Sequence, residues 1–107
     1  MIEEIDMLLE RIRYVSLELY KNNLIGVADE IFEMFPKINQ ILLKLISDGN
    51  RYKEIGIEVP QSILILQVKN FLESFEQKDV LMLADTMKYE IYEGLSYYRE
   101  LLTNTGI

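Results

Sequence analysis

Apolar residues recur every three or four positions through most of this chain, a spacing that gathers them on one face of a helix. The pattern predicts helices at about residues 2–20, 24–47, 60–76 and 80–102. The inward stripe of the third helix, for example, consists of Leu64, Val68, Phe71, Leu72 and Phe75. The fold class expected from this pattern is all-α.

Short polar segments join these helices in pairs. Lys21–Asn23 follows the first helix, and Gln77–Asp79 follows the third, with Asp79 placed to cap the fourth. Because a short turn forces neighbouring helices to run antiparallel, each pair forms a helical hairpin. We therefore expect one domain over residues 1–107: a four-helix bundle with hairpin one at about 2–47, a linker at 48–59 and hairpin two at about 60–103.

The two hairpins resemble each other in sequence. Residues 24–31 align with residues 80–87 at an offset of 56 positions, and Ala28-Asp29 matches Ala84-Asp85. Either the hairpin is duplicated, or two amphipathic helices of similar length align by chance. Both interpretations lead to the same bundle.

The second helix contains a proline. Since Pro36 removes one backbone hydrogen bond, the helix is either kinked at about Phe32 or broken near Phe35. The apolar period continues across Pro36 without a change of phase, and this continuity favours a kink.

The segment after the second helix is expected to be irregular. Asp48-Gly49-Asn50 is a stop signal, with Gly49 suited to a left-handed helix end. Residues 51–59 show no helical stripe and form the linker. Pro60 is placed as the first residue of the third helix, where its missing N–H costs nothing.

The composition removes several classes of function. The chain has no cysteine and no histidine, so disulfides, thiolate zinc sites and Ser-His-Asp or Cys-His catalysis are excluded. The net charge is −7 and the basic residues are scattered singly, which disfavours nucleic acid and anionic membranes as partners. No apolar run reaches the roughly 20 residues of a membrane span, and the acidic N-terminus differs from a signal peptide. We expect a cytoplasmic, non-catalytic protein without a cofactor or a metal.

Two groups of large side chains lie outside the predicted stripes. The first is a candidate interaction face on the fourth helix, composed of Leu81, Met82, Asp85, Tyr89 and Tyr92. Tyrosine and methionine are enriched in interface cores, although scattered apolar surface residues are also common. The second candidate face is composed of Ile63, Leu66, Met7 and Tyr14. Because the start of the third helix is apolar nearly all round, either a second copy of the chain or the linker covers it, and we favour a homodimer.

Residues 78–91, with the sequence KDVLMLADTMKYEI, resemble the signature of a small helical family of Gram-positive bacteria. That family has a pattern close to KD-x-VLLAD-x-LEYE-L and no established function. The resemblance marks Asp79, Asp85, Tyr89 and Glu90 and implies no catalytic role for them. The chain departs from the pattern at Lys88 and lacks the usual proline after the Tyr-Glu pair. The overall shape is also similar to flagellar export chaperones, which are small acidic bundles that hold a helix of a partner.

The function expected from these features is a protein–protein interaction module of adaptor or chaperone type that binds a helix on the fourth-helix face. The alternative is a bundle that binds a small ligand or a metal between its hairpins. A ligand site needs inward polar groups, and the predicted stripes contain almost none. A helix-binding site needs an exposed apolar strip, which Met82 and Tyr89 supply.

Overall fold

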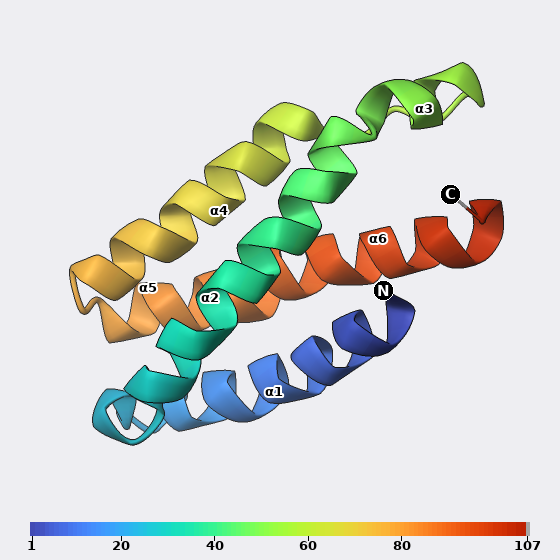
Figure 1. Ribbon diagram of the computed structural model, residues 1–107. Helices are drawn as coiled ribbons and strands as arrows, with labels where there is room; N and C mark the ends of the chain where they lie inside the picture. Colours follow the sequence, from blue (N-terminus) through green and yellow to red (C-terminus); the bar gives the residue numbers. More distant parts are fainter. Residues whose placement is uncertain (107) are drawn as a thin grey trace.

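The computed structural model describes residues 1–106 as a set of packed helices (Figure 1). The long helices are α1 (Ile2–Tyr20), α2 (Leu24–Ser47) and α4 (Gln61–Glu76), and the short α3 (Gly49–Glu54) lies between α2 and α4. The last helical stretch is made of α5 (Val80–Asp85), the π-helix η1 (Thr86–Ile91) and α6 (Tyr92–Thr105). Within residues 1–106 there is no strand, so the predicted all-α class is confirmed.

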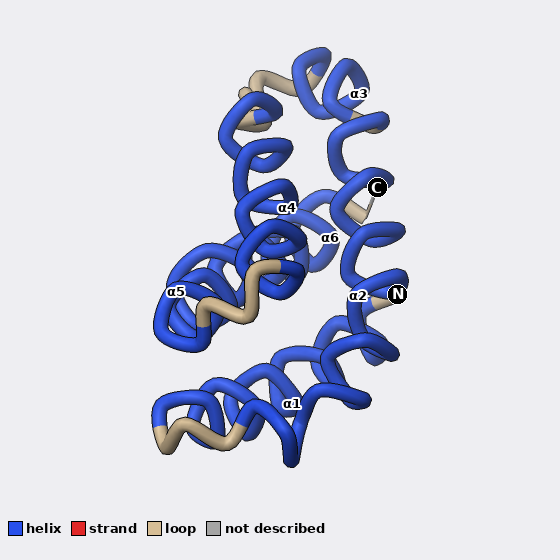
Figure 2. The backbone as a smooth tube through the Cα atoms, turned by 90° about the vertical axis from the view of Figure 1, so that its left-hand side faces the viewer, coloured by secondary structure: helices blue, strands red, loops and turns tan. Residues whose placement is uncertain are grey.

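The long elements follow one another in alternating directions (Figure 1). α1 packs against α2 and along the whole last stretch, from α5 to α6. α4 packs against α5 and η1, while α2 contacts α4 and α6. α1 and α4 lie apart in both views (Figures 1 and 2). The helices enclose one apolar core, and the molecule measures 44 × 25 × 19 Å.

The predicted inward stripes form this core with one correction on α4. Leu64 and Phe71 are buried as expected, and the Phe71 ring lies 5.3 Å from the ring of Phe35 on α2. Leu72 is exposed, contrary to the prediction. The inward face of α4 includes Ser74 instead, because it lies three residues after Phe71 on the same side of the helix. The buried Ser74 hydroxyl donates a hydrogen bond to the Phe71 carbonyl at 3.0 Å.

Both predicted short turns are present, between α1 and α2 and between α4 and α5. Asn22 and Lys78 adopt left-handed backbone conformations with φ of 61° and 55°. The side chain of Asn23 accepts a hydrogen bond from the Gly26 amide, and that of Asp79 accepts one from the Met82 amide, each at 3.2 Å. These caps satisfy amides that the first turn of a helix leaves unpaired, which is why α2 and α5 begin where the sequence predicts.

The segment between α2 and α4 differs from the prediction. Gly49 is not left-handed; it begins α3, and the left-handed glycine of this segment is Gly56, with φ of 84°. The segment is helical because it carries one large core side chain, Tyr52, which is fully buried. Pro60 stands just before α4 rather than as its first residue.

α2 runs without a break through Pro36, so the alternative of two separate helices is wrong. The buried residues Ile31, Met34 and Ile38 continue in phase on both sides of the proline. Packing of this face outweighs the one backbone hydrogen bond that Pro36 cannot make. Neither α2 nor any other helix within residues 1–106 is long and apolar enough to cross a membrane.

The π-helix η1 keeps one face of the last stretch on the core. The buried residues Leu83, Met87, Ile91 and Leu95 follow one another at intervals of four. In an α-helix, at about 100° per residue, each such step drifts by about 40°. A π-helix turns by only about 80° per residue, so six π-helical residues recover about 120°. Leu83 and Leu95 therefore face the same core, although the sequence predicted an ordinary α-helix here.

Candidate functional site

The residues of the first predicted face fall into two groups. Leu81 and Tyr89 are 64% and 60% exposed, and Met82 is exposed as well. Asp85 and Tyr92, in contrast, are hydrogen-bonded to side chains of α1. The first candidate face is therefore continuous with α1 on one side, which the sequence did not predict.

Polar side chains line the border between α1 and the last stretch. We call this border the seam; it is formed by Arg13, Ser16 and Tyr20 of α1 and by Asp85, Lys88, Tyr89 and Tyr92.

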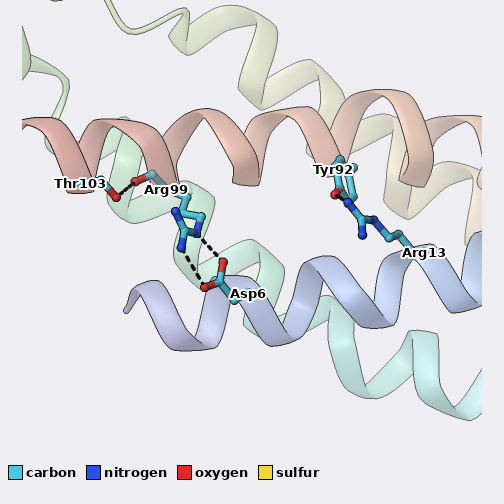
Figure 3. A network of polar contacts seen from close by, with 5 residues as sticks. All are labelled: Asp6, Arg13, Tyr92, Arg99 and Thr103. Atoms are coloured by element: carbon cyan, nitrogen blue, oxygen red, sulfur yellow. Dashed lines mark hydrogen bonds and ion pairs between the residues drawn. The ribbon is translucent and has the colours of Figure 1, made fainter.

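Two hydrogen bonds cross the seam. The Tyr20 hydroxyl donates to the Asp85 carboxylate. The Arg13 guanidinium donates to the Tyr92 hydroxyl, as Figure 3 shows. Burial, followed by the bond to Asp85, raises the pKa of Tyr20 to about 12, so this hydroxyl keeps its proton at neutral pH.

The two cations of the seam lie over tyrosine rings. The Arg13 guanidinium carbon is 5.2 Å from the centroid of the Tyr92 ring. The Lys88 ammonium is 5.1 Å from the Tyr89 centroid and 5.5 Å from the Tyr20 centroid, so it lies between the two helices. Contacts of this kind contribute about 0.5–1 kcal/mol each at exposed sites. They fix positive charge at one place on an otherwise acidic protein.

Two adjoining cavities open along the seam, with volumes of about 250 and 260 Å³. Arg13, Ser16 and Lys88 line both of them. Ser16 is 3% exposed, and its hydroxyl has no hydrogen-bond partner within residues 1–106. A buried hydroxyl without a partner costs free energy, and such a group beside a cavity is a candidate contact for a ligand.

Farther along α1, an ion pair joins it to α6. Arg99 donates to both carboxylate oxygens of Asp6, with 3.1 Å between Nη2 and Oδ2 (Figure 3). The hydrogen bond from Arg99 holds the pKa of the Asp6 carboxyl below its usual range. This pair and the seam together hold α1 against the last stretch by polar contacts along its length.

The second predicted face is exposed but spread over two helices. Ile63 and Leu66 are both more than half exposed on α4, so the linker does not cover them. Met7 and Tyr14 are exposed on α1, which lies apart from α4 in both views (Figures 1 and 2). These residues form two separate patches.

Sequence reasoning overlooked a further apolar surface, on the outside of α2. We call it the outer line of α2; it consists of Ile25, Phe32, Pro36 and Leu43. Ile25 is 97% exposed, Phe32 72% and Leu43 50%, and Pro36 is exposed as well. The sequence does contain a signal for this surface, because its residues form a second apolar stripe that is offset from the buried one.

No role was predicted for Arg13, Ser16, Tyr20 and Lys88 of the seam. Ser16 could have been noticed, because it lies four residues after Ile12 on the side of the apolar stripe. Arg13 and Lys88 could not, since their roles depend on how α1 docks against η1. Among the described residues, no three acidic side chains converge as metal ligands.

Comparison with other proteins adds no family or fold relationship. No protein-family model, no curated protein and no solved structure matches this chain.

Proposed function

We propose that this chain is a four-helix bundle of two hairpins that acts as a non-catalytic protein-interaction module, of adaptor or chaperone-like type. The observation that carries the proposal is the exposure of Leu81, Met82 and Tyr89 along α5 and η1. Large apolar side chains grouped on a surface are typical of protein interfaces. The partner that suits a strip of this shape is an amphipathic helix laid along it.

Photo-cross-linking in cells that produce the protein tests this function. A photoreactive amino acid replaces Met82 in one variant and Tyr89 in another. A matched control carries it at Ile55, which is also exposed but lies in the connection between the hairpins. We expect adducts to another polypeptide from positions 82 and 89 and none from position 55. Adducts of equal yield at all three positions, or at none, would contradict the proposal.

A second candidate function is the binding of a small ligand between the two hairpins, and the seam cavities favour it. α1 belongs to one hairpin and η1 to the other, and the Ser16 hydroxyl lies between them without a partner. Arg13 and Lys88 suit an anionic head group, while Ile12 and the tyrosine rings suit an apolar body. Glu93 also lines the first cavity and would repel an anion from that side. The ligand class that fits is a small carboxylate with an apolar tail.

Octanoate is a suitable probe for the seam, with octanol as the uncharged control. Amide resonances of Ser16, Lys88 and Tyr89 should shift saturably with octanoate and much less with octanol. Lys88→Gln should weaken octanoate binding about tenfold, whereas Lys37→Gln on the exposed side of α2 should leave it unchanged. Equal shifts with both probes would exclude an anion site.

A further inference from the structure

The outer line of α2 is unusual because it runs nearly the length of a helix whose opposite face is already the core. Its members Ile25, Phe32, Pro36 and Leu43 are 7, 4 and 7 residues apart, which places them within an arc of about 40°. The line spans 18 residues, or about 27 Å. A helix that is apolar on two opposite sides is normally covered on both. We propose that a second copy of this chain covers this line, with the two α2 helices antiparallel around a two-fold axis at the level of Met34.

The spacing of the line is the first reason to assign a second copy. Positions 25 and 43, and positions 32 and 36, are symmetric about position 34. In an antiparallel pair centred there, Ile25 meets Leu43 of the partner subunit, and Phe32 meets Pro36 of the partner subunit. A two-fold interface requires this kind of reciprocity, in which residue i contacts j and j contacts i. The line is therefore self-complementary, as a two-fold pair needs.

Charge supplies the second reason and sets the direction of the pair. Glu33 and Lys37 lie on the same flank of the line and are both well exposed, with 3.9 Å between the two charged groups. In the antiparallel pair centred on position 34, Lys37 lies between the levels of the partner subunit's Glu33 and the partner subunit's Asp29, about 3 Å along the axis from each. In a parallel two-fold pair this flank would face the opposite flank of α2, which carries no charged side chain, so no such opposite charges would meet. Exposed pairs contribute little affinity, but they discriminate between orientations.

The contacts that Glu33 already makes are compatible with this arrangement. Besides Lys37, its carboxylate lies 3.9 Å from the Arg11 guanidinium of α1, which in turn pairs with Glu30 at 3.0 Å. These contacts hold the carboxylate on the flank of α2 and leave more than half of the side chain exposed. The dimer therefore needs no rearrangement of the monomer, and it leaves Leu81, Met82 and Tyr89 uncovered. It does not depend on the interaction face proposed above.

Molar mass in solution, measured by light scattering on a sizing column over a concentration series, tests the dimer. Wild type should approach about twice the chain mass of 12.6 kDa as its concentration rises. Phe32→Gln and Ile25→Gln should each weaken dimerisation at least tenfold and remain folded by circular dichroism, because neither side chain belongs to the core. Leu81→Gln is the matched control, since Leu81 is about as exposed as Phe32 but lies on α5, and it should leave the dimer intact.

Because the natural chain has no cysteine, single cysteines report the direction of the pair. A mixture of the variants Ile25→Cys and Leu43→Cys should form a mixed disulfide dimer on mild oxidation, while Ile25→Cys alone should stay mostly uncross-linked. Three outcomes overturn the proposal: a monomer at all concentrations, a dimer lost in Leu81→Gln but kept in Phe32→Gln, or efficient self-cross-linking of Ile25→Cys. The second outcome would instead support self-association through the face proposed above.

Discussion

The seam and the outer line of α2 both place aromatic side chains at the surface, yet they differ in what surrounds those rings. In the seam, the Tyr20 and Tyr92 hydroxyls are bonded to Asp85 and Arg13, and the rings lie under cations. On the outer line, Phe32 has no polar atom beyond its backbone, and 72% of it is exposed. Polar groups of the same chain complete the first surface. The second is hydrocarbon, and only another apolar surface can complete it.

Exposed aromatic residues are therefore of two kinds in this molecule. A tyrosine at a helix junction can expose its ring edge while its hydroxyl and face are satisfied within the monomer. A phenylalanine on the outer side of a helix gains nothing from its position in the monomer. Exposure alone places Tyr89 of the seam, at 60%, close to Phe32, at 72%, whereas the partners of each side chain distinguish them.

The largest expected effect comes from two neighbours on α2 that face opposite ways. Ile31 is fully buried and Phe32 is mostly exposed. Ile31→Ala should lower the free energy of unfolding by about 2–4 kcal/mol because it leaves a cavity in the core. Phe32→Ala should change it by less than about 0.5 kcal/mol when measured by urea denaturation at a concentration where the protein is monomeric.

If Phe32→Ala were as destabilising as Ile31→Ala under those conditions, the two faces of α2 would not differ as described. Phe32 would then be packed within the monomer, and the outer line would not be available to a second copy. Repeating both titrations at high protein concentration sharpens the test, because Phe32→Ala should then lose the stabilisation that dimerisation gives to wild type.

Alkaline pH should act on a partnered and an unpartnered tyrosine hydroxyl in the same way. Burial raises the pKa of both Tyr20 and Tyr98 to about 12, and Tyr20 is further bonded to Asp85. The fold therefore favours the protonated over the ionised form of each; this stability is fully present below the ordinary tyrosine pKa of 10.0 and is lost as pH rises from there through about 12. Urea titrations between pH 9 and 12 should show the free energy of unfolding falling in this window (about pH 10 to 12), and either Tyr→Phe variant should reduce the slope.

At neutral pH the same two substitutions should diverge. The Tyr98 hydroxyl is buried and has no hydrogen-bond partner within residues 1–106. Tyr98→Phe should therefore leave stability unchanged or raise it slightly, by up to about 1 kcal/mol. Tyr20→Phe should lower stability because it leaves the Asp85 carboxylate without its donor. If Tyr20→Phe caused no loss, the bond from Tyr20 to Asp85 would contribute nothing to stability.

Much of the fold could be predicted from the sequence because its signals are local. The bounds of α1 and α2 follow from the apolar period and from caps such as Asn23, which act within a few residues. α3 was missed because one buried residue, Tyr52, decides it, and a single large side chain leaves no period to detect. The π-helix was missed for the opposite reason. Its signal, three successive intervals of four residues between core positions, is present in the sequence, but such a pattern also suits an ordinary helix.

The candidate site could be predicted less well because it depends on contacts between distant segments. Leu81, Met82 and Tyr89 were recognised from one helix alone, since each is large and lies off the stripe. The bonds from Tyr20 to Asp85 and from Arg13 to Tyr92 join residues 65 and 79 positions apart. No spacing rule connects such residues until the docking of α1 is known.

The smallest expected effect concerns the ion pair between Asp6 and Arg99, which closes the other end of α1. Asp6→Asn should cause a small loss of stability at neutral pH and low salt, because the lost contact is exposed and screened. The hydrogen bond from Arg99 lowers the pKa of Asp6, so its stabilisation is present above the usual value of 3.8 and is lost as pH falls through the lower folded value. The difference between Asp6→Asn and wild type should therefore shrink below about pH 4 and in 1 M salt. Lys69→Gln, which removes a local pair with Glu73 on α4, is the control and should show no greater effect. If Asp6→Asn instead had no effect at neutral pH and low salt, the bonds around Tyr20 and Tyr92 would be the polar contacts that hold α1, and the contrast with the outer line of α2 would be confined to the seam.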